Sequence, residues 1–309
     1  MPAFEMSEIR GVIPAMITPF DRDERLDEAR LRSCTRFLIR KGIEGLYLTG
    51  STGEGFLMSQ EERKRVVEVV IDETGKRLPV IVHVGAIGTK LSVELAEHAQ
   101  SAGADAVSSV PPFYWAFSQD QIHDFYRDVA GATDLPMIVY NVPMAGVMGF
   151  SLIARLATIP RVAGIKYTAQ TQFDILRIKQ EIGPDFRVYS GSDEMALSGF
   201  SYGADGIIGS FYNLMPELFL RIERAVASGD VEGARALQAK ANTIIFFSLA
   251  RNMTAIIKRG MAWQGADAGY CRRPFGNYYD AEQEGVLKAE FRGLRDSNDL
   301  SGVDFLEAI

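Results

Sequence analysis

The chain has 309 residues, of which 47% are hydrophobic, and its formal net charge at pH 7 is −7. This composition is ordinary for a globular protein and excludes collagen-like, disordered and disulfide-rich classes. Nucleic acid is not an expected partner, because neutralising phosphates takes clustered Lys and Arg. Cys34 and Cys271 are too few for a disulfide framework or a thiolate metal cluster. With no signal-peptide pattern and no apolar stretch near ~18 residues, we expect a cytoplasmic protein that does not enter membranes.

Short apolar runs recur along the first two thirds of the chain, separated by longer amphipathic segments. Continuous apolar character in short runs is typical of parallel strands that are covered on both faces. The expected strands are Gly11–Thr18, Gly45–Thr49, Val80–Val84, Ala106–Val110, Met137–Tyr140, Val162–Lys166, Arg187–Ser190 and Gly206–Gly209.

The segments between these runs have helical spacing and recognisable starts. Ser59 precedes one of them, and Glu62 three residues later predicts a capping box. Glycine is the residue expected just beyond a helix C-terminus. Two further expected helices, each with its terminating glycine, are Ser92–Ala102 with Gly103 and Ser118–Val129 with Gly131.

Eight strand–helix repeats with short connections favour an α/β fold of the (β/α)8 TIM-barrel type. A doubly wound sheet is the alternative, but it usually needs fewer repeats, and no dinucleotide-binding fingerprint is present. After Ser210 the strand pattern stops and the sequence predicts helices. We therefore expect residues 1–225 to form the barrel that carries the active site, and residues 226–309 to form a C-terminal helical extension packed on it.

Lys166 and Tyr140 end two neighbouring expected strands, at the edge where a barrel carries its active site. Apolar surroundings favour the neutral form of a lysine amine. A neutral amine can attack a ketone to give a Schiff base, an electron sink for making or breaking an adjacent carbon–carbon bond. Tyr140 is placed to move a proton in the same barrel mouth. The structural alternatives are a solvated surface lysine and a half-buried tyrosine with a satisfied hydroxyl.

The loop Gly50–Gly55, with the sequence Gly-Ser-Thr-Gly-Glu-Gly, follows the second expected strand. Its glycines allow a tight turn in which backbone N–H groups and the hydroxyls of Ser51 and Thr52 surround an anion. No Lys or Arg accompanies the loop, so a carboxylate fits better than a phosphate. Glu54 is expected to hold the loop by accepting backbone hydrogen bonds.

Acidic and hydroxyl side chains follow the last two expected strands, in Gly191–Glu194 and in Gly209–Ser210. Asp193 and Glu194 are candidates for binding the hydroxyls of a polyol, and helix capping is their structural alternative. Histidines are scattered and lack metal-ligand spacing, so no metal site is expected. These histidines are His83, His98 and His123.

Five motifs in this order resemble those of the dihydrodipicolinate synthase / N-acetylneuraminate lyase superfamily, each at an expected strand end. They are Gly50–Glu54, Tyr140–Pro143, Gly164–Thr168, Gly191–Glu194 and Gly209–Ser210. The likeness extends over nearly the whole chain, from Gly11 to Phe275. It implies a class I, Schiff-base aldolase or related dehydratase on a (β/α)8 barrel, assembled as a homotetramer and requiring no metal or cofactor.

The resemblance also implies roles for individual residues. Lys166 forms the Schiff base with pyruvate or another 2-keto acid, and Tyr140 shuttles protons. Ser51 and Thr52 bind the keto-acid carboxylate, and Thr52 also belongs to the catalytic set. Tyr114 matches a catalytic tyrosine near the subunit interface, which in the synthases reaches the neighbouring site. The residues implied to hold the hydroxylated tail of a sugar acid are Thr168, Gly191, Asp193, Glu194 and Ser210.

The lyase branch of the superfamily is favoured over the synthase branch. The synthases carry an arginine for the second carboxylated substrate where this chain has Ala145, so a bidentate clamp is missing. Ala145 also differs from the larger aliphatic residue typical of the lyases. We predict a pyruvate-dependent lyase for a sugar acid of the N-acetylneuraminate type, which releases pyruvate and an aldehyde sugar. The alternatives are a 2-keto-3-deoxy sugar acid aldolase or dehydratase, a synthase-like condensing enzyme, a metal-dependent aldolase and a non-catalytic keto-acid sensor.

Overall fold

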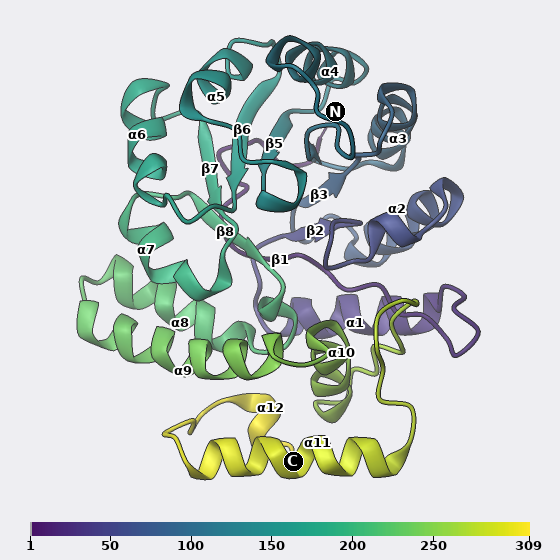
Figure 1. Cartoon of the computed structure of the whole chain (residues 1–309), viewed down its shortest axis with the longest axis vertical. Helices are drawn as coiled ribbons and strands as arrows, with labels where there is room; N and C mark the ends of the chain where they lie inside the picture. Colours follow the sequence, from purple (N-terminus) through teal and green to yellow (C-terminus); the bar gives the residue numbers. More distant parts are fainter. Residues whose placement is uncertain (1) are drawn as a thin grey trace.

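A computed structural model describes residues 2–309, in which strands alternate with helices around one parallel sheet (Figure 1). The strands follow one another around the sheet in the order β1-β8-β7-β6-β5-β4-β3-β2, so all neighbours except β1 and β8 are also consecutive in the chain. The strands are β1 (Gly11–Pro14), β2 (Leu46–Leu48), β3 (Val80–His83), β4 (Ala106–Ser109), β5 (Met137–Asn141), β6 (Val162–Tyr167), β7 (Arg187–Ser190) and β8 (Gly206–Gly209).

The sheet closes on itself between its two end strands. Ala15 forms a parallel bridge with Tyr47, and the Met16 N–H donates to the Tyr47 carbonyl at 2.9 Å. On the other side, β1 pairs with β8 from Gly11 to Pro14. The predicted (β/α)8 barrel is therefore confirmed, and the doubly wound sheet is wrong.

Helices follow the strands and cover the outside of the barrel (Figure 1). Within residues 2–309, no helix is long and apolar enough to cross a membrane. The α-helices are α1 (Glu28–Arg40), α2 (Gln60–Thr74), α3 (Thr89–Ala102), α4 (Gln119–Gly131), α5 (Phe150–Leu156), α6 (Phe173–Glu181), α7 (Ala196–Ser201), α8 (Pro216–Ala227), α9 (Val231–Leu249), α10 (Met253–Trp263), α11 (Ala281–Asp296) and α12 (Asp304–Glu307). The short 3₁₀ helices are η1 (Gly55–Leu57), η2 (Pro143–Ala145), η3 (Asp193–Met195) and η4 (Phe211–Asn213).

The ends of these helices show which sequence signals predicted a helix start or stop correctly. The predicted capping box is present at α2, where the Ser59 side chain and Glu62 bond to each other's backbone N–H. Gly103 ends α3 in the left-handed conformation, as predicted. Gly131 is instead the last residue within α4, and the helix ends at Ala132. Helix α3 begins at Thr89, before the predicted Ser92, whose hydroxyl accepts the N–H of Ala86 in the preceding loop.

Side chains alternate between two cores because successive strand residues point to opposite faces of the sheet. Val12 faces the helices, and Ile13 faces the barrel axis. Aliphatic and aromatic side chains therefore fill the barrel interior. They are Ile9, Ile13, Ala15, Tyr47, Ile81, Ala106, Ile138, Tyr189 and Ile208.

Helices α9 to α12 extend beyond the eight repeats. Helix α9 packs alongside α8, and α11 lies past α10 at the end of the molecule (Figure 1). An aromatic cluster joins the last three helices, with ring centroids 5.9 Å apart for Trp263 and Phe291 and 5.3 Å apart for Phe291 and Phe305. Helix α8 runs to Ala227, past the predicted boundary between residues 225 and 226, and α9 packs along it. The division of the chain at that boundary stays a prediction.

Two carboxyl groups meet at the amino-terminal end of the barrel. Glu44 accepts the N–H of Val12 at 2.9 Å, and Glu223 on α8 lies next to it. Burial and the neighbouring Glu44 carboxylate raise the pKa of Glu223 to about 7, while Arg224 and Arg10 oppose this shift. Ionising Glu223 therefore costs more in the folded protein than in the unfolded chain.

This pair predicts how stability depends on pH. A carboxyl whose folded pKa is raised loses stability as the pH rises from its unfolded pKa near 4.5 to about 7. We expect Glu223→Gln to raise the melting temperature by a few degrees at pH 8 and to change it little at pH 5. Thermal unfolding at both pH values measures this, with the exposed Glu282→Gln as the matched control. An equal gain in the control, or no difference between the two pH values, would contradict the assignment.

Candidate active site

Lys166 lies near the carboxyl end of β6, at the centre of one rim of the barrel. The parallel register aligns it with Tyr140 of β5 and Tyr189 of β7. Its Nζ is 4.2 Å from the ring centroid of Tyr140 and 4.6 Å from that of Tyr47, and the residue is only 4% exposed. The amine is thus enclosed by aromatic faces instead of extending into solvent, so the surface-lysine alternative is wrong.

The rings around the amine are fixed by their own contacts. The Tyr47 hydroxyl donates to Ser108 Oγ at 3.1 Å, and the Tyr47 ring meets the Tyr140 ring edge-on at 6.3 Å. His83 packs edge-on against Tyr140, and its Nε2 accepts the N–H of Val110 at 3.2 Å. Burial, together with the nearby Arg63 and Lys166 charges, lowers the pKa of His83 well below its usual value. His83 is therefore a neutral ring that supports Tyr140.

The loop after β2 is locked by a buried ion pair that the sequence analysis missed. Lys258 Nζ on α10 lies 2.6 Å from Glu54 Oε1, and both side chains are at most 1% exposed. Glu54 Oε2 accepts the N–H of Arg272 at 2.7 Å, which confirms that Glu54 accepts a backbone hydrogen bond. Lys258 also donates to the carbonyls of Thr18 and Tyr270. The sequence feature that could have revealed this ion pair is the position of Lys258 on the apolar face of an expected helix.

The hydroxyls of this loop reach the rim. Thr52 Oγ1 and Ser210 Oγ are 2.7 Å apart, which joins the loops after β2 and β8. Ser51 lines a cavity together with Val142, which follows β5. Both predicted carboxylate-binding hydroxyls are therefore placed at the carboxyl ends of the strands.

Thr168 and Gly191 are in close contact beside Lys166. A Cβ atom on Gly191 would lie 1.8 Å from Thr168 Oγ1 and 3.1 Å from Lys166 Cε, so only glycine fits there. Thr168 Oγ1 is buried and has no hydrogen-bond partner within residues 2–309. A buried hydroxyl without a partner is costly, and it can bond to a molecule that occupies the site.

Asp193 and Glu194 differ in their surroundings. Asp193 Oδ2 accepts the N–H groups of Ser210 and Phe211 at 2.9 and 2.8 Å, and burial raises the pKa of Asp193 to about 6. Asp193 thus binds the start of the neighbouring helix η4. Glu194 is partly exposed at the same rim, and its carbonyl accepts the side-chain N–H of Asn242 on α9.

Tyr114 lies apart from this cluster in the single chain. Its side chain is 84% exposed, its φ angle is 82°, and its ring meets that of Trp115 edge-on at 4.8 Å. The structure therefore brings the other predicted residues to one rim but leaves Tyr114 on the surface.

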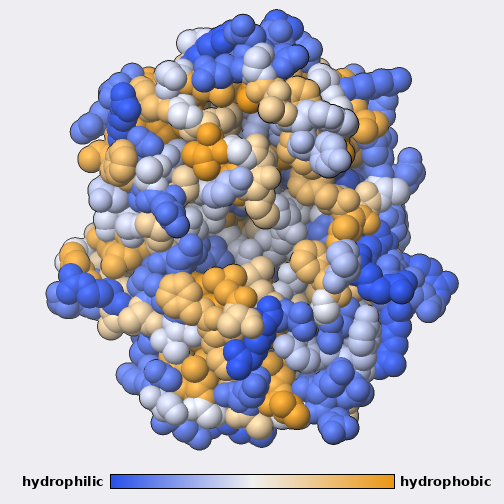
Figure 2. Space-filling model, viewed as in Figure 1, coloured by the Kyte–Doolittle hydropathy of each residue, from blue (hydrophilic) through white to orange (hydrophobic). Residues whose placement is uncertain are grey.

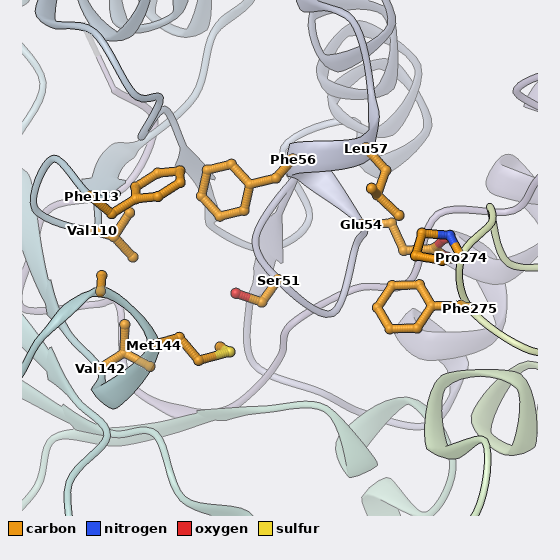
Figure 3. Close-up of a pocket in the computed structure, with 11 residues that line it drawn as sticks. Ser51, Glu54, Phe56, Leu57, Val110, Phe113, Val142, Met144, Pro274 and Phe275 are labelled. Carbon is orange, nitrogen blue, oxygen red and sulfur yellow. The ribbon is translucent and has the colours of Figure 1, made fainter. Parts of the chain in front are cut away.

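A cavity of about 310 Å³ opens beside these groups (Figure 3). The surface view shows a hollow near the middle of one face, bordered by both hydrophobic and hydrophilic residues (Figure 2). Within residues 2–309, no three His, Cys, Asp or Glu side chains are grouped as metal ligands. The lining residues of the cavity are Ser51, Glu54, Phe56, Leu57, Val110, Phe113, Val142, Met144, Ala145, Pro274 and Phe275.

The Glu54–Lys258 pair predicts a large, coupled effect on stability. Lys258→Met leaves a buried carboxylate without a counter-charge, which we expect to cost about 3–5 kcal/mol of unfolding free energy. The double variant with Glu54→Gln should lose less than the sum of the two single variants. Urea denaturation measures this, with the exposed Arg235→Met as a control that should cost less than about 1 kcal/mol. Strict additivity of the two buried changes would show that the pair does not act as a unit.

Comparisons with known proteins agree with this geometry. The model of the dihydrodipicolinate synthetase family matches residues 8–289. The N-acetylneuraminate lyase of Rhizobium meliloti (strain 1021) is 38% identical over 284 residues, which cover 91% of this chain and 94% of that protein. CdNal from Clostridium difficile, solved in complex with mannosamine, matches with a TM-score of 0.89 at 31% identity, over 93% of this chain and 99% of that chain. The sialic acid aldolase of Ruminococcus gnavus, solved as a catalytic lysine mutant, matches with a TM-score of 0.89 at 31% identity, over 96% and 98% of the two chains. The chain therefore belongs to the dihydrodipicolinate synthetase family and is a carbon–carbon lyase.

Proposed function

We propose that this enzyme is a pyruvate-dependent lyase that cleaves a sugar acid of the N-acetylneuraminate type through a Schiff base on Lys166. The observation that carries the proposal is the buried Lys166 amine, held between the Tyr47 and Tyr140 rings at the strand end where barrel enzymes place their catalytic groups. The names of the lyase relatives support the substrate class. A catalytic lysine in the aldolase of Ruminococcus gnavus supports the role of Lys166.

The proposed reaction begins with attack of the Lys166 amine on the C2 ketone of the substrate. Loss of water gives an iminium ion, into which electrons can flow. Tyr140 assists removal of the proton from the C4 hydroxyl, and the C3–C4 bond breaks. Its electron pair forms an enamine, while C4 leaves as an aldehyde. Protonation at C3 and hydrolysis of the imine then release pyruvate and return the free amine.

The remaining groups bind the two ends of the substrate. Ser51 and Thr52 receive the keto-acid carboxylate, with Thr52 held by its contact to Ser210. Thr168 offers to the sugar tail a hydroxyl that has no partner within residues 2–309, and Glu194 offers a partly exposed carboxylate. Asp193 acts by holding the loop after β8, because its Oδ2 atom is occupied by two backbone N–H groups.

We include a homotetramer in the proposal, with Tyr114 completing a neighbouring subunit's site. Tyr114 and Trp115 are 84% and 62% exposed, and exposed aromatic groups are typical of protein interfaces. The φ angle of 82° at Tyr114 is unusual for a bulky residue, and such backbone strain clusters at functional positions.

The test is pyruvate release from N-acetylneuraminate, measured with two matched variants. Tyr140→Phe keeps the ring beside Lys166 but removes the proton-transfer group, so we expect kcat to fall by about 10²-fold or more. Tyr47→Phe makes the same change on the other side of the amine, where the hydroxyl is bonded to Ser108. We expect this control to lose less than about tenfold, since it removes one neutral hydrogen bond.

Two results would contradict the proposal. The absence of pyruvate release by the folded enzyme would remove N-acetylneuraminate as a substrate. Equal losses of kcat in Tyr140→Phe and Tyr47→Phe would show that Tyr140 has no special part in proton transfer.

A further inference from the structure

Two amide side chains on α9 contact the turn that follows β7. Gln238 and Asn242 lie about one helical turn apart, and Gln238 Nε2 donates to Asn242 Oδ1 at 2.8 Å. Gln238 Nε2 also donates to the carbonyl of Asp193 at 3.1 Å. Asn242 Nδ2 donates to the carbonyl of Glu194 at 3.2 Å. The two amides together therefore hold the carbonyls of both acidic residues of η3.

Gln238 lies on the buried face of α9, where apolar side chains are the usual occupants. Leu237 and Ala241 are buried on the same helix, and Gln238 is only 7% exposed. An amide in such surroundings is costly unless its polar atoms are bonded. The Oε1 atom of Gln238 accepts the N–H of Leu197, the second residue of α7, at 2.9 Å. Both ends of this amide are therefore bonded to the backbone after β7.

The η3 turn depends on such support from another element. It has three residues, and the side chain of Ser192 at its N-cap forms no capping hydrogen bond within the described chain. Burial, and after it the nearby Glu194 charge, raises the pKa of the Asp193 carboxyl. Like charges repel, so an unsupported turn would relax by moving the two carboxylates apart. The bonds from α9 to both carbonyls oppose that movement.

The two acidic side chains of the turn are held differently. The Asp193 carboxylate is itself anchored, because its Oδ2 accepts two backbone N–H groups after β8. Glu194 is partly exposed, and the bond from Asn242 to its carbonyl fixes its backbone at the rim. A carboxylate whose backbone is fixed in advance loses less entropy when it binds hydroxyl groups. The orientation of Glu194 therefore depends on the contact with Asn242.

These contacts lie apart from the keto-acid end of the site. Within residues 2–309, the hydrogen bonds of the two amides go to each other and to the backbone of η3 and α7. Lys166 is held instead by its strand pairing and by the Tyr47 and Tyr140 rings. Removal of an α9 amide should therefore weaken the binding of a hydroxylated tail and leave Schiff-base formation intact.

We propose that Gln238 and Asn242 are positioning residues that set the preference of the enzyme for a hydroxylated aldehyde half. They act through the backbone of η3, which places the Glu194 carboxylate where hydroxyls of the substrate tail can donate to it. This inference rests on the proposed lyase function and adds to it two residues from outside the eight repeats. The C-terminal helices thereby take part in substrate selection.

The test is pyruvate release from N-acetylneuraminate, with Asn242→Leu as the main variant. Leucine has a similar size but cannot donate to the Glu194 carbonyl, so we expect KM to rise about tenfold and kcat to change less than about threefold. The pyruvate concentration that gives half-maximal borohydride trapping should stay the same. Thr243→Val is the matched control on the next residue of α9, where the hydroxyl donates to the carbonyl of Ala239 within the helix. This control should leave all three quantities unchanged.

Two further variants examine how the amides act. Gln238→Met removes the second amide from the same turn and should also raise KM with little change in kcat, with the melting temperature reporting that the variant is folded. In a Glu194→Gln background, Asn242→Leu should add little further loss, because both changes act on one carboxylate.

The outcomes separate this inference from the function on which it rests. An unchanged KM in the folded variants, an equal weakening of pyruvate trapping, or a fully additive loss in the double variant overturns the positioning role alone. A wild-type enzyme that traps no pyruvate, or that does not cleave N-acetylneuraminate, overturns the proposed function and the positioning role with it.

Discussion

The register between β5, β6 and β7 is the constraint on which the site depends. It aligns Tyr140, Lys166 and Tyr189 across three neighbouring strands, at the rim where all the parallel strands end. The Tyr189 hydroxyl donates to the carbonyl of Ile9 at 2.9 Å and so ties this layer to the segment before β1. A shift of one residue in β6 would turn Lys166 toward the helices, because side chains alternate between the two faces. The closed barrel makes such a shift costly, since every strand is paired on both sides.

The segment beyond the eight repeats stabilises the catalytic rim. Lys258 on α10 holds the loop after β2 through Glu54, and Gln238 on α9 donates to the carbonyl of Asp193 after β7. A buried ion pair in an apolar interior is unfavourable unless both charges are fully bonded. Here Lys258 has three oxygen partners, one of them Glu54, and Glu54 also accepts a backbone N–H. The C-terminal helices therefore hold one loop that lies 204 residues earlier in the chain and another that lies 45 residues earlier.

The rim combines two kinds of surface around one amine. Hydroxyl and carboxyl groups lie on the side of β6, β7 and β8, where the buried Thr168 hydroxyl has no partner among the residues that the structure describes. Carbon surfaces lie on the side of β2, β4 and β5, around Val110 and Val142. An aldol reaction joins a keto acid to an aldehyde, so the binding of the aldehyde half decides which substrates are turned over.

The sequence predicted the barrel and its rim well because both depend on local patterns. Apolar runs mark the strands, and Lys166 and Tyr140 are recognisable from their places at strand ends. Long-range pairing was not predictable in this way. Lys258 lies in a helical segment, and its partner Glu54 is far away in the chain. Asp193 was a candidate for binding substrate hydroxyls, with capping of its own helix as the alternative, yet its carboxylate accepts the backbone N–H groups after β8. The apolar cavity is built from several separate loops, so no single motif could reveal it.

The central claim is that Lys166 is the reactive amine. Its most direct test is borohydride reduction in the presence of pyruvate, followed by intact-protein and peptide mass spectrometry, with Lys166→Ala alongside. The account predicts one reduced pyruvyl adduct, on the peptide that contains Lys166, and none in the variant. A folded enzyme that forms no adduct, or that forms it on another lysine, would contradict the account.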